Sequence, residues 1–312
     1  MLSRVADSLY WMSRYFERAD HCARVLEATY GLSLNPAKTS SEQRWYRALV
    51  FLGLPPSDAP DLDPQRLIIP IATDPANRSS IVACIKAARE NAAQVREEIS
   101  LEMWEQLNML FHEVAQGGVG PGDDAAAMKL VSAVRERSFK FHGVTDACMN
   151  HGEGWHFIQL GKYSERACCV SVLLDAYFSV STPANELDWL GLLTSSAAFE
   201  AYCKVYTADL HGERIGEFLL LNAEFPYSVR FSAERMQEAL DAITVRASSK
   251  KADEIDRIIG RLRSSLAYTE IKDVMAGSFH TYLNRVIDQC RDLHAALHQA
   301  YIDYAIEAAI EV

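Results

Sequence analysis

Several features that mark common functional classes are missing from this chain of 312 residues. No run of basic residues occurs and the formal net charge is −11, so the chain lacks the clustered Lys and Arg that displace counterions from a phosphate backbone. We therefore expect no nucleic-acid partner. No stretch reaches the roughly 18 uncharged apolar residues that a bilayer crossing needs, which predicts a soluble protein with no membrane association.

Cysteine is present, but not in paired spacings. The seven cysteines do not outline the disulfide framework of a small secreted domain, and the adjacent Cys168 and Cys169 lie in a helical pattern that suits reduced, buried thiols. The opening MLSRVADSLYWM also lacks the basic region, apolar core and cleavage site of a secretory signal. We expect a cytoplasmic protein.

Motifs that indicate catalysis or cofactor binding are absent as well. The sequence contains no Gly-rich phosphate loop, no zinc-protease helix motif and no nucleophile elbow. His294 and His298 stand four residues apart, but no third zinc ligand follows from the spacing, and we interpret them as part of a solvated face. The sequence predicts no catalytic residue, no cofactor and no metal site.

What the sequence does have is helical periodicity, and no stretch alternates with period two for long enough to predict a sheet. From Val5 to Tyr30 the apolar residues alternate steps of four and three, and Gly31 is expected to end that helix. Ser79 or Ser80 is expected to cap one unbroken helix that continues to Gly117, and Asp123 is expected to cap the next helix. Further helices are expected in segments 42–53, 66–73, 123–150, 153–181, 186–206, 226–243 and 252–268, and from 270 onward. The predicted fold class is all-α.

A Glu-Arg-Ala motif occurs twice in similar surroundings. RYFERADHCARVLEATY begins at Arg14, and KYSERACCVSVLLDAYF begins at Lys162. The same offset takes Ser80 to Ser228. We interpret this as a duplicated helical unit and predict a helical bundle with pseudo-two-fold symmetry. Residues 1–150 would form the first repeat and residues 151–312 the second, within one compact unit.

Four segments together resemble the Alpha-E domain family, helical proteins with a repeated Glu-Arg motif. They are the opening MLSRVADSLYWMSRYFERADHCARVLEATY, then ARENAAQVREEISLEMWEQLN, GWHFIQLGKYSERACCVSVLL and FPYSV. The resemblance implies association with ATP-grasp ligases and transglutaminase-like cysteine peptidases in peptide or amide-bond modification, and so a protein partner of one of these kinds. In the second motif the family tends to carry Gly-Arg where this chain has Gly161-Lys162. Here Lys162 keeps the charge and loses the planar bidentate fork.

The charges of the two motifs need partners. Glu17 and Arg18 are neighbours, so on a helix they point roughly 100° apart and cannot pair with each other. Glu165 and Arg166 lie in a helix that is apolar on nearly every face, which is typical of a buried helix. Because unpaired buried charges are costly, we expect reciprocal pairs, Glu17 with Arg166 and Glu165 with Arg18.

Three interpretations of this charge cluster remain open: an ion-pair clasp that sets the register of the two halves, a pocket for an acidic or peptide-like ligand, and a solvated face. The cluster, which is also the candidate ligand-binding site, comprises Arg14, Glu17, Arg18, Arg24, Lys162, Glu165 and Arg166. The leading hypothesis is a non-catalytic helical scaffold or substrate-presenting partner in a bacterial-type peptide-ligase or amide-modification system. The alternative is an enzyme or ligand-binding protein with a charged site between the halves.

Overall fold

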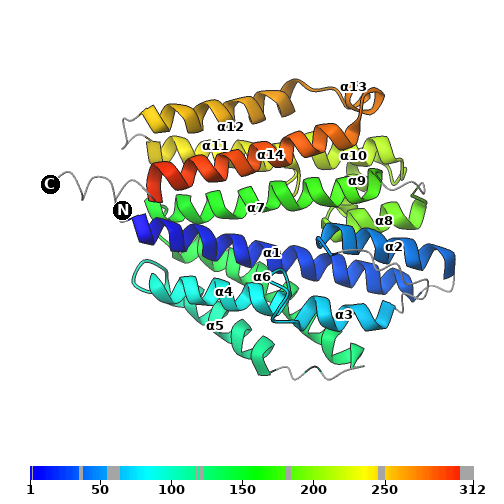
Figure 1. Cartoon of the computed structure of the whole chain (residues 1–312), viewed down its shortest axis with the longest axis horizontal. Helices are drawn as coiled ribbons and strands as arrows, with labels where there is room; N and C mark the ends of the chain where they lie inside the picture. The colour runs from blue at the N-terminus through cyan, green and yellow to red at the C-terminus, as the bar shows by residue number, and fades with distance from the viewer. Residues whose placement is uncertain are drawn as a thin grey trace.

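Two long helices lie side by side at the centre of the computed structural model (Figure 1). They are α1 (Ser3–Ser33) and α7 (Glu153–Phe178). The first residue of α7 pairs with the amino group of Met1, and further along Arg166 pairs with Glu17. Because both contacts follow the same order from the N-terminal to the C-terminal end of each helix, the two helices run parallel. The structure describes residues 1, 3–34, 38–54, 64–116, 119, 123–179, 184–244 and 250–302.

The other helices surround this central pair. Helices α4, α6 and α8 pack on α1, α11 and α14 pack on α7, and α2 packs on both (Figure 1). The bounds are α2 (Lys38–Phe51), α3 (Pro64–Thr73), α4 (Ile81–Gln94), α5 (Leu101–Gln116), α6 (Asp124–Cys148), α8 (Glu186–Ser195), α9 (Phe199–Tyr206), α10 (Gly212–Leu221), α11 (Val229–Thr244), α12 (Lys250–Tyr268), α13 (Ile271–Ala276), α14 (Phe279–Leu297) and the π-helical turn η1 (His298–Ile302). The described residues contain no strand, and the all-α class is confirmed.

Two of the expected helix starts are confirmed by their caps. The Ser80 side chain accepts a hydrogen bond from the Ala83 N–H at 3.2 Å, and Asp123 accepts one from the Ala126 N–H at 3.0 Å. Each bond satisfies one of the backbone donors that a helix start leaves open.

The prediction of one unbroken helix after Ser80 is wrong. Helix α4 ends at Gln94, and α5 begins at Leu101. The Ser100 hydroxyl accepts a hydrogen bond from the Met103 N–H at 3.2 Å and so starts a new helix. Val95, in the connecting turn, is buried, which continues the apolar stripe across the break and explains why periodicity alone did not reveal it.

Other helix ends also differ from expectation. Helix α1 continues past Gly31 to Ser33, since one Gly costs a helix interior only about 1 kcal/mol. Segment 186–206 divides where Ala197 adopts a positive φ of 49°. The last expected helix divides at Gly277, whose N–H closes α13 on the Asp273 carbonyl. Helix α10 was not predicted. The ends expected at residues 117 and 181 lie outside the described residues.

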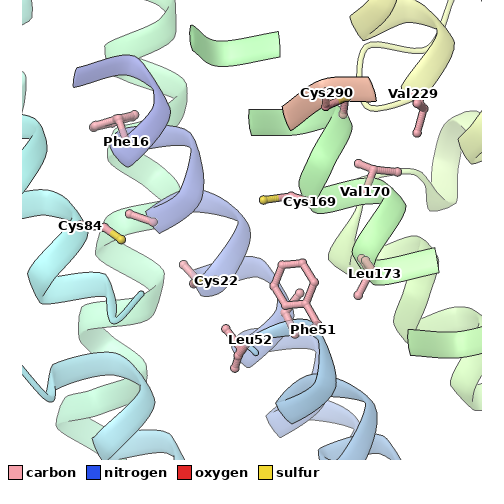
Figure 2. Close-up of a cluster of buried hydrophobic side chains, with 14 of the residues drawn as sticks. Phe16, Cys22, Phe51, Leu52, Cys84, Cys169, Val170, Leu173, Val229 and Cys290 are labelled. Atoms are coloured by element: carbon pink, nitrogen blue, oxygen red, sulfur yellow. The ribbon is translucent and has the colours of Figure 1, made fainter. Parts of the chain in front are cut away.

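One continuous hydrophobic core joins these helices. In Figure 2, α1 passes between α4 and α7, with Phe16 and Cys22 on α1 and Cys84 on α4. Val170 of α7 and Val229 of α11 belong to the same core. None of the described helices is both long and apolar enough to span a bilayer.

Candidate functional site

The two Glu-Arg motifs meet between α1 and α7, which approach each other closely at Tyr10 and Gly161. Gly161 makes this approach possible, because a Cβ at that position would lie 2.3 Å from the Tyr10 carbonyl oxygen. The face of α1 that carries Glu17 therefore packs on another helix instead of facing solvent, and Glu17 is fully buried. The interpretation of these charges as a solvated face is wrong.

Glu165 is held by two arginines of α1. Its Oε1 accepts a hydrogen bond from Arg18 Nε at 2.6 Å, and its Oε2 accepts one from Arg14 Nε at 2.7 Å. Burial alone would raise the pKa of Glu165, but the attraction of Arg14 and Arg18 outweighs it and holds the pKa below its ordinary value. The expected Glu165–Arg18 pair is confirmed, and Arg14 adds a second bridge.

Glu17 has a different set of partners. Arg166 Nε donates to Glu17 Oε1 at 2.6 Å, which confirms the expected pair. The second oxygen faces His142 Nε2 of α6 at 3.2 Å, and His21 Nε2 lies 3.5 Å from Oε1. Burial would raise the pKa of Glu17, yet Arg166 and the two imidazoles hold it well below the ordinary value. Burial, with repulsion from Lys162, lowers the pKa of His142 to about 4, so its imidazole is neutral near pH 7.

Arg24 is near the cluster but does not contact either glutamate. Its Nε donates to Asp20 Oδ2 at 2.8 Å one turn earlier on α1, and Tyr227 Oη donates to the same oxygen at 3.2 Å. Tyr227 also lies beneath the Arg166 guanidinium, 4.0 Å from ring centroid to Cζ. Asp20, His142 and Tyr227 were not predicted as site residues. Asp20 lies in the first motif segment and Tyr227 in the FPYSV segment, whereas His142 lies in neither.

Lys162 occupies the motif position of Arg14 but makes a different contact. Among the described residues no carboxylate lies within ion-pair distance of its ammonium, which sits 5.2 Å from the Tyr163 ring centroid. It lines a cavity of about 560 Å³ between α6, α7 and α11. Burial, together with the nearby Arg166, lowers the pKa of Lys162 to about 8.

The cavity wall combines cations with aromatic rings. Arg166 and Arg235 join Lys162 on the cationic side. The aromatic side chains are Trp155, Tyr163 and Phe231, with His142 and His156, and the carboxylates are Asp146 and Glu238. Of the seven predicted residues, only Lys162 and Arg166 line this cavity, whereas Arg14, Glu17, Arg18 and Glu165 form the ion pairs beside it. Such a wall can hold a ligand that carries negative charge and a flat apolar group.

Lys162 should react as an amine at unusually low pH. In a pH series of acylation with acetic anhydride, we expect half-maximal modification of Lys162 near pH 8, because burial and Arg166 favour its neutral form. Peptide mass spectrometry would follow Lys162 and the exposed Lys140 in the same digest. Modification of Lys162 that begins only near the ordinary value of 10.5 would contradict this expectation.

Three buried cysteines and His294 lie outside this cavity. Burial raises the pKa of the thiols of Cys22, Cys84 and Cys169, which disfavours the nucleophilic thiolate. His294 does not lie on a solvated face, since its half-buried ring stacks on Tyr10 at 5.6 Å between centroids. Within the part of the chain that the structure describes, no three His, Cys, Asp or Glu side chains are placed to hold a metal ion.

Comparison with known proteins identifies relatives along most of the chain. Uncharacterized proteins of Mycobacterium bovis and of two strains of Mycobacterium tuberculosis are each 24% identical over 317 residues, a match that covers 94% of this chain and 35% of theirs. The chain therefore spans about a third of the length of these relatives. No solved structure matches.

The match to a family model covers still more of the chain. The Alpha-E model, described as a predicted alpha-helical domain with a conserved ER motif, matches residues 1–302. Both Glu-Arg pairs described above lie within these bounds. The chain therefore belongs to the Alpha-E family.

Proposed function

We propose that this chain is a non-catalytic helical domain that holds an acidic, peptide-like substrate and presents it to an enzyme that makes or breaks amide bonds. The observation that carries the proposal is the cavity of about 560 Å³ on which Lys162, Arg166 and Arg235 converge. Its volume suits a ligand of a few residues. The glutamates of the two motifs are already engaged in ion pairs, which leaves them a structural role beside this cavity.

The proposal includes a pseudo-two-fold arrangement of residues 1–150 and 151–312 within one compact unit. Three features support it. Helix α1 packs on α4 as α7 packs on α11. Ser80 and Ser228 each accept a hydrogen bond from the N–H three residues later. Each motif also supplies an arginine to the glutamate of the other. The ion pairs would then act as a clasp that sets the register of the halves.

A partner enzyme is part of the proposal. The resemblance noted in the sequence implies an ATP-grasp ligase-like or transglutaminase-like protein. The mycobacterial relatives extend well beyond the matched region, which supports a domain that works together with other domains. The seven cysteines are free, which supports a reducing, cytoplasmic compartment.

The alternative is that the cavity itself is an active site. One observation favours it: the low pKa of Lys162, about 8, is a property that lysine nucleophiles and bases share. The closed ion pairs favour the presenting role, because a carboxylate engaged by one or two arginines is a poor base.

Affinity purification from the native cell should separate these hypotheses. We expect the tagged chain, with and without crosslinking, to enrich one ligase-like or transglutaminase-like protein, and the Lys162→Met variant to retain that protein while losing co-purified small molecules. Mass spectrometry of both fractions is the measurement. Turnover of a peptide or amide substrate by the purified chain alone would overturn the presenting role in favour of the enzyme.

A further inference from the structure

We propose that the cavity between α6, α7 and α11 binds a free carboxylate of a short peptide through Lys162 and Arg235, with an adjacent aromatic side chain of the ligand packed against Trp155 and Phe231. This inference deepens the proposed function and rests on it only in treating the cavity as the ligand site. It assigns a chemical class to the ligand and a specific contact to Lys162.

The glutamates of the two motif copies have different partners. Glu165 receives two arginines, Arg14 and Arg18. Among the described residues one arginine, Arg166, contacts Glu17, and His142 of α6 faces the second carboxylate oxygen. His142 thus takes the place at Glu17 that Arg14 takes at Glu165. Lys162 stands at the motif position of Arg14, and it lines the cavity instead of bridging to a glutamate.

The charges around Lys162 are either already paired or exposed to solvent. Arg166 is 3% exposed and already neutralised by Glu17. Arg235 pairs with Glu238 at 2.6 Å between Nη2 and Oε1, but these side chains are 38% and 56% exposed and Asp146 is 73% exposed, so water and salt screen these charges. The ammonium of Lys162 is half-buried without an ion-pair partner among the described residues. A ligand carboxylate would supply the missing counter-charge.

The aromatic wall decides between a peptide-like ligand and a bare anion. Trp155, Tyr163 and Phe231 border the same space as the cations. Arg235 lies over the Phe231 ring at 5.0 Å, so its guanidinium is held beside an apolar surface. A ligand that offers only charge would leave this surface unused, whereas an aromatic side chain next to a carboxylate would cover it.

Calorimetric titration with a matched pair of probes tests the assignment. The probes are N-acetyl-Phe-Glu, which has two free carboxylates, and N-acetyl-Phe-Gln amide, which has none. We expect the acid probe to bind the purified full chain at least about tenfold more tightly than the amide, a difference of about 1.4 kcal/mol. Lys162→Met should lose about tenfold in affinity for the acid probe. Lys140→Met, which removes an exposed lysine of α6, should lose none.

The pH dependence is a second readout that a structural role of Lys162 would not produce. Above pH 8 the ammonium loses its proton, so the affinity of the wild type for the acid probe should fall there while that of Lys162→Met stays level. The other ionisable groups that face Lys162 are Glu17 and Asp20 on α1, His142 and Asp146 on α6, His156, Tyr163 and Arg166 on α7, and Arg235 and Glu238 on α11.

Each outcome has a definite meaning. Equal affinities for the acid and amide probes, or an unchanged affinity in Lys162→Met, would overturn the assignment. Inorganic phosphate that binds as tightly as the acid probe would also overturn it, because a simple anion site needs no aromatic wall. If titration fails while the tagged chain still captures its enzyme partner, the ligand assignment falls and the partner role stands.

Discussion

Truncation of Arg166 to Ala should lower the free energy of unfolding by about 3–5 kcal/mol. Arg166 is the only arginine on Glu17 among the described residues, and Glu17 is fully buried. Without Arg166, the contacts left to this buried carboxylate among the described residues are the imidazoles of His21 and His142, and His142 is neutral at pH 7. Denaturant melts of the wild type and the variant measure the difference.

The double variant Glu17→Met/Arg166→Met should recover much of this loss, because neither charge then remains unpaired in the core. Lys140→Ala provides the comparison at the surface. It breaks the Lys140–Glu136 pair, whose side chains are 53% and 72% exposed, and should cost about 1 kcal/mol or less. If Arg166→Ala melts like the wild type, or the double variant is no better than the single one, Glu17 and Arg166 do not form a stabilising clasp.

A single methyl group at Gly161 should destabilise the protein by about 3 kcal/mol, the upper end of the usual cost of overpacking. The Cβ of Gly161→Ala would come within 2.3 Å of the Tyr10 carbonyl oxygen, a backbone atom that can move only if α1 and α7 separate. That separation would lengthen the ion pairs on both glutamates. Thermal and denaturant melts would measure the loss.

Gly260→Ala is the matched control for this prediction. Gly260 lies inside α12, and a Cβ there would meet no atom within 4 Å. Alanine is the better helix former, so this change should stabilise the protein by about 0.5–1 kcal/mol. The two substitutions are chemically identical, but their effects on the free energy of unfolding should have opposite signs. A stabilising Gly161→Ala would mean that α1 and α7 do not approach as closely as described.

The sequence alone determined the fold class and much of the ion pairing. Periodicity is a local property, so the apolar stripe of α1 and the caps at Ser80 and Asp123 could be predicted from neighbouring residues. The apolar surroundings of Glu165 and Arg166 required buried partners of opposite charge, and the duplicated motif supplied them. That reasoning led to Glu17–Arg166 and Glu165–Arg18, which both form.

The tertiary structure decided which copy of the motif is closed and which borders a cavity. His142 lies on α6, a helix with no sign of the motif, and faces Glu17 only because α6 packs on α1. Arg235 reaches the cavity from α11 for the same kind of reason. Contacts between residues far apart in the chain depend on how whole helices pack, and no local pattern records them. The two equivalent positions therefore differ in role: Arg14 bridges to Glu165, and Lys162 lines the cavity.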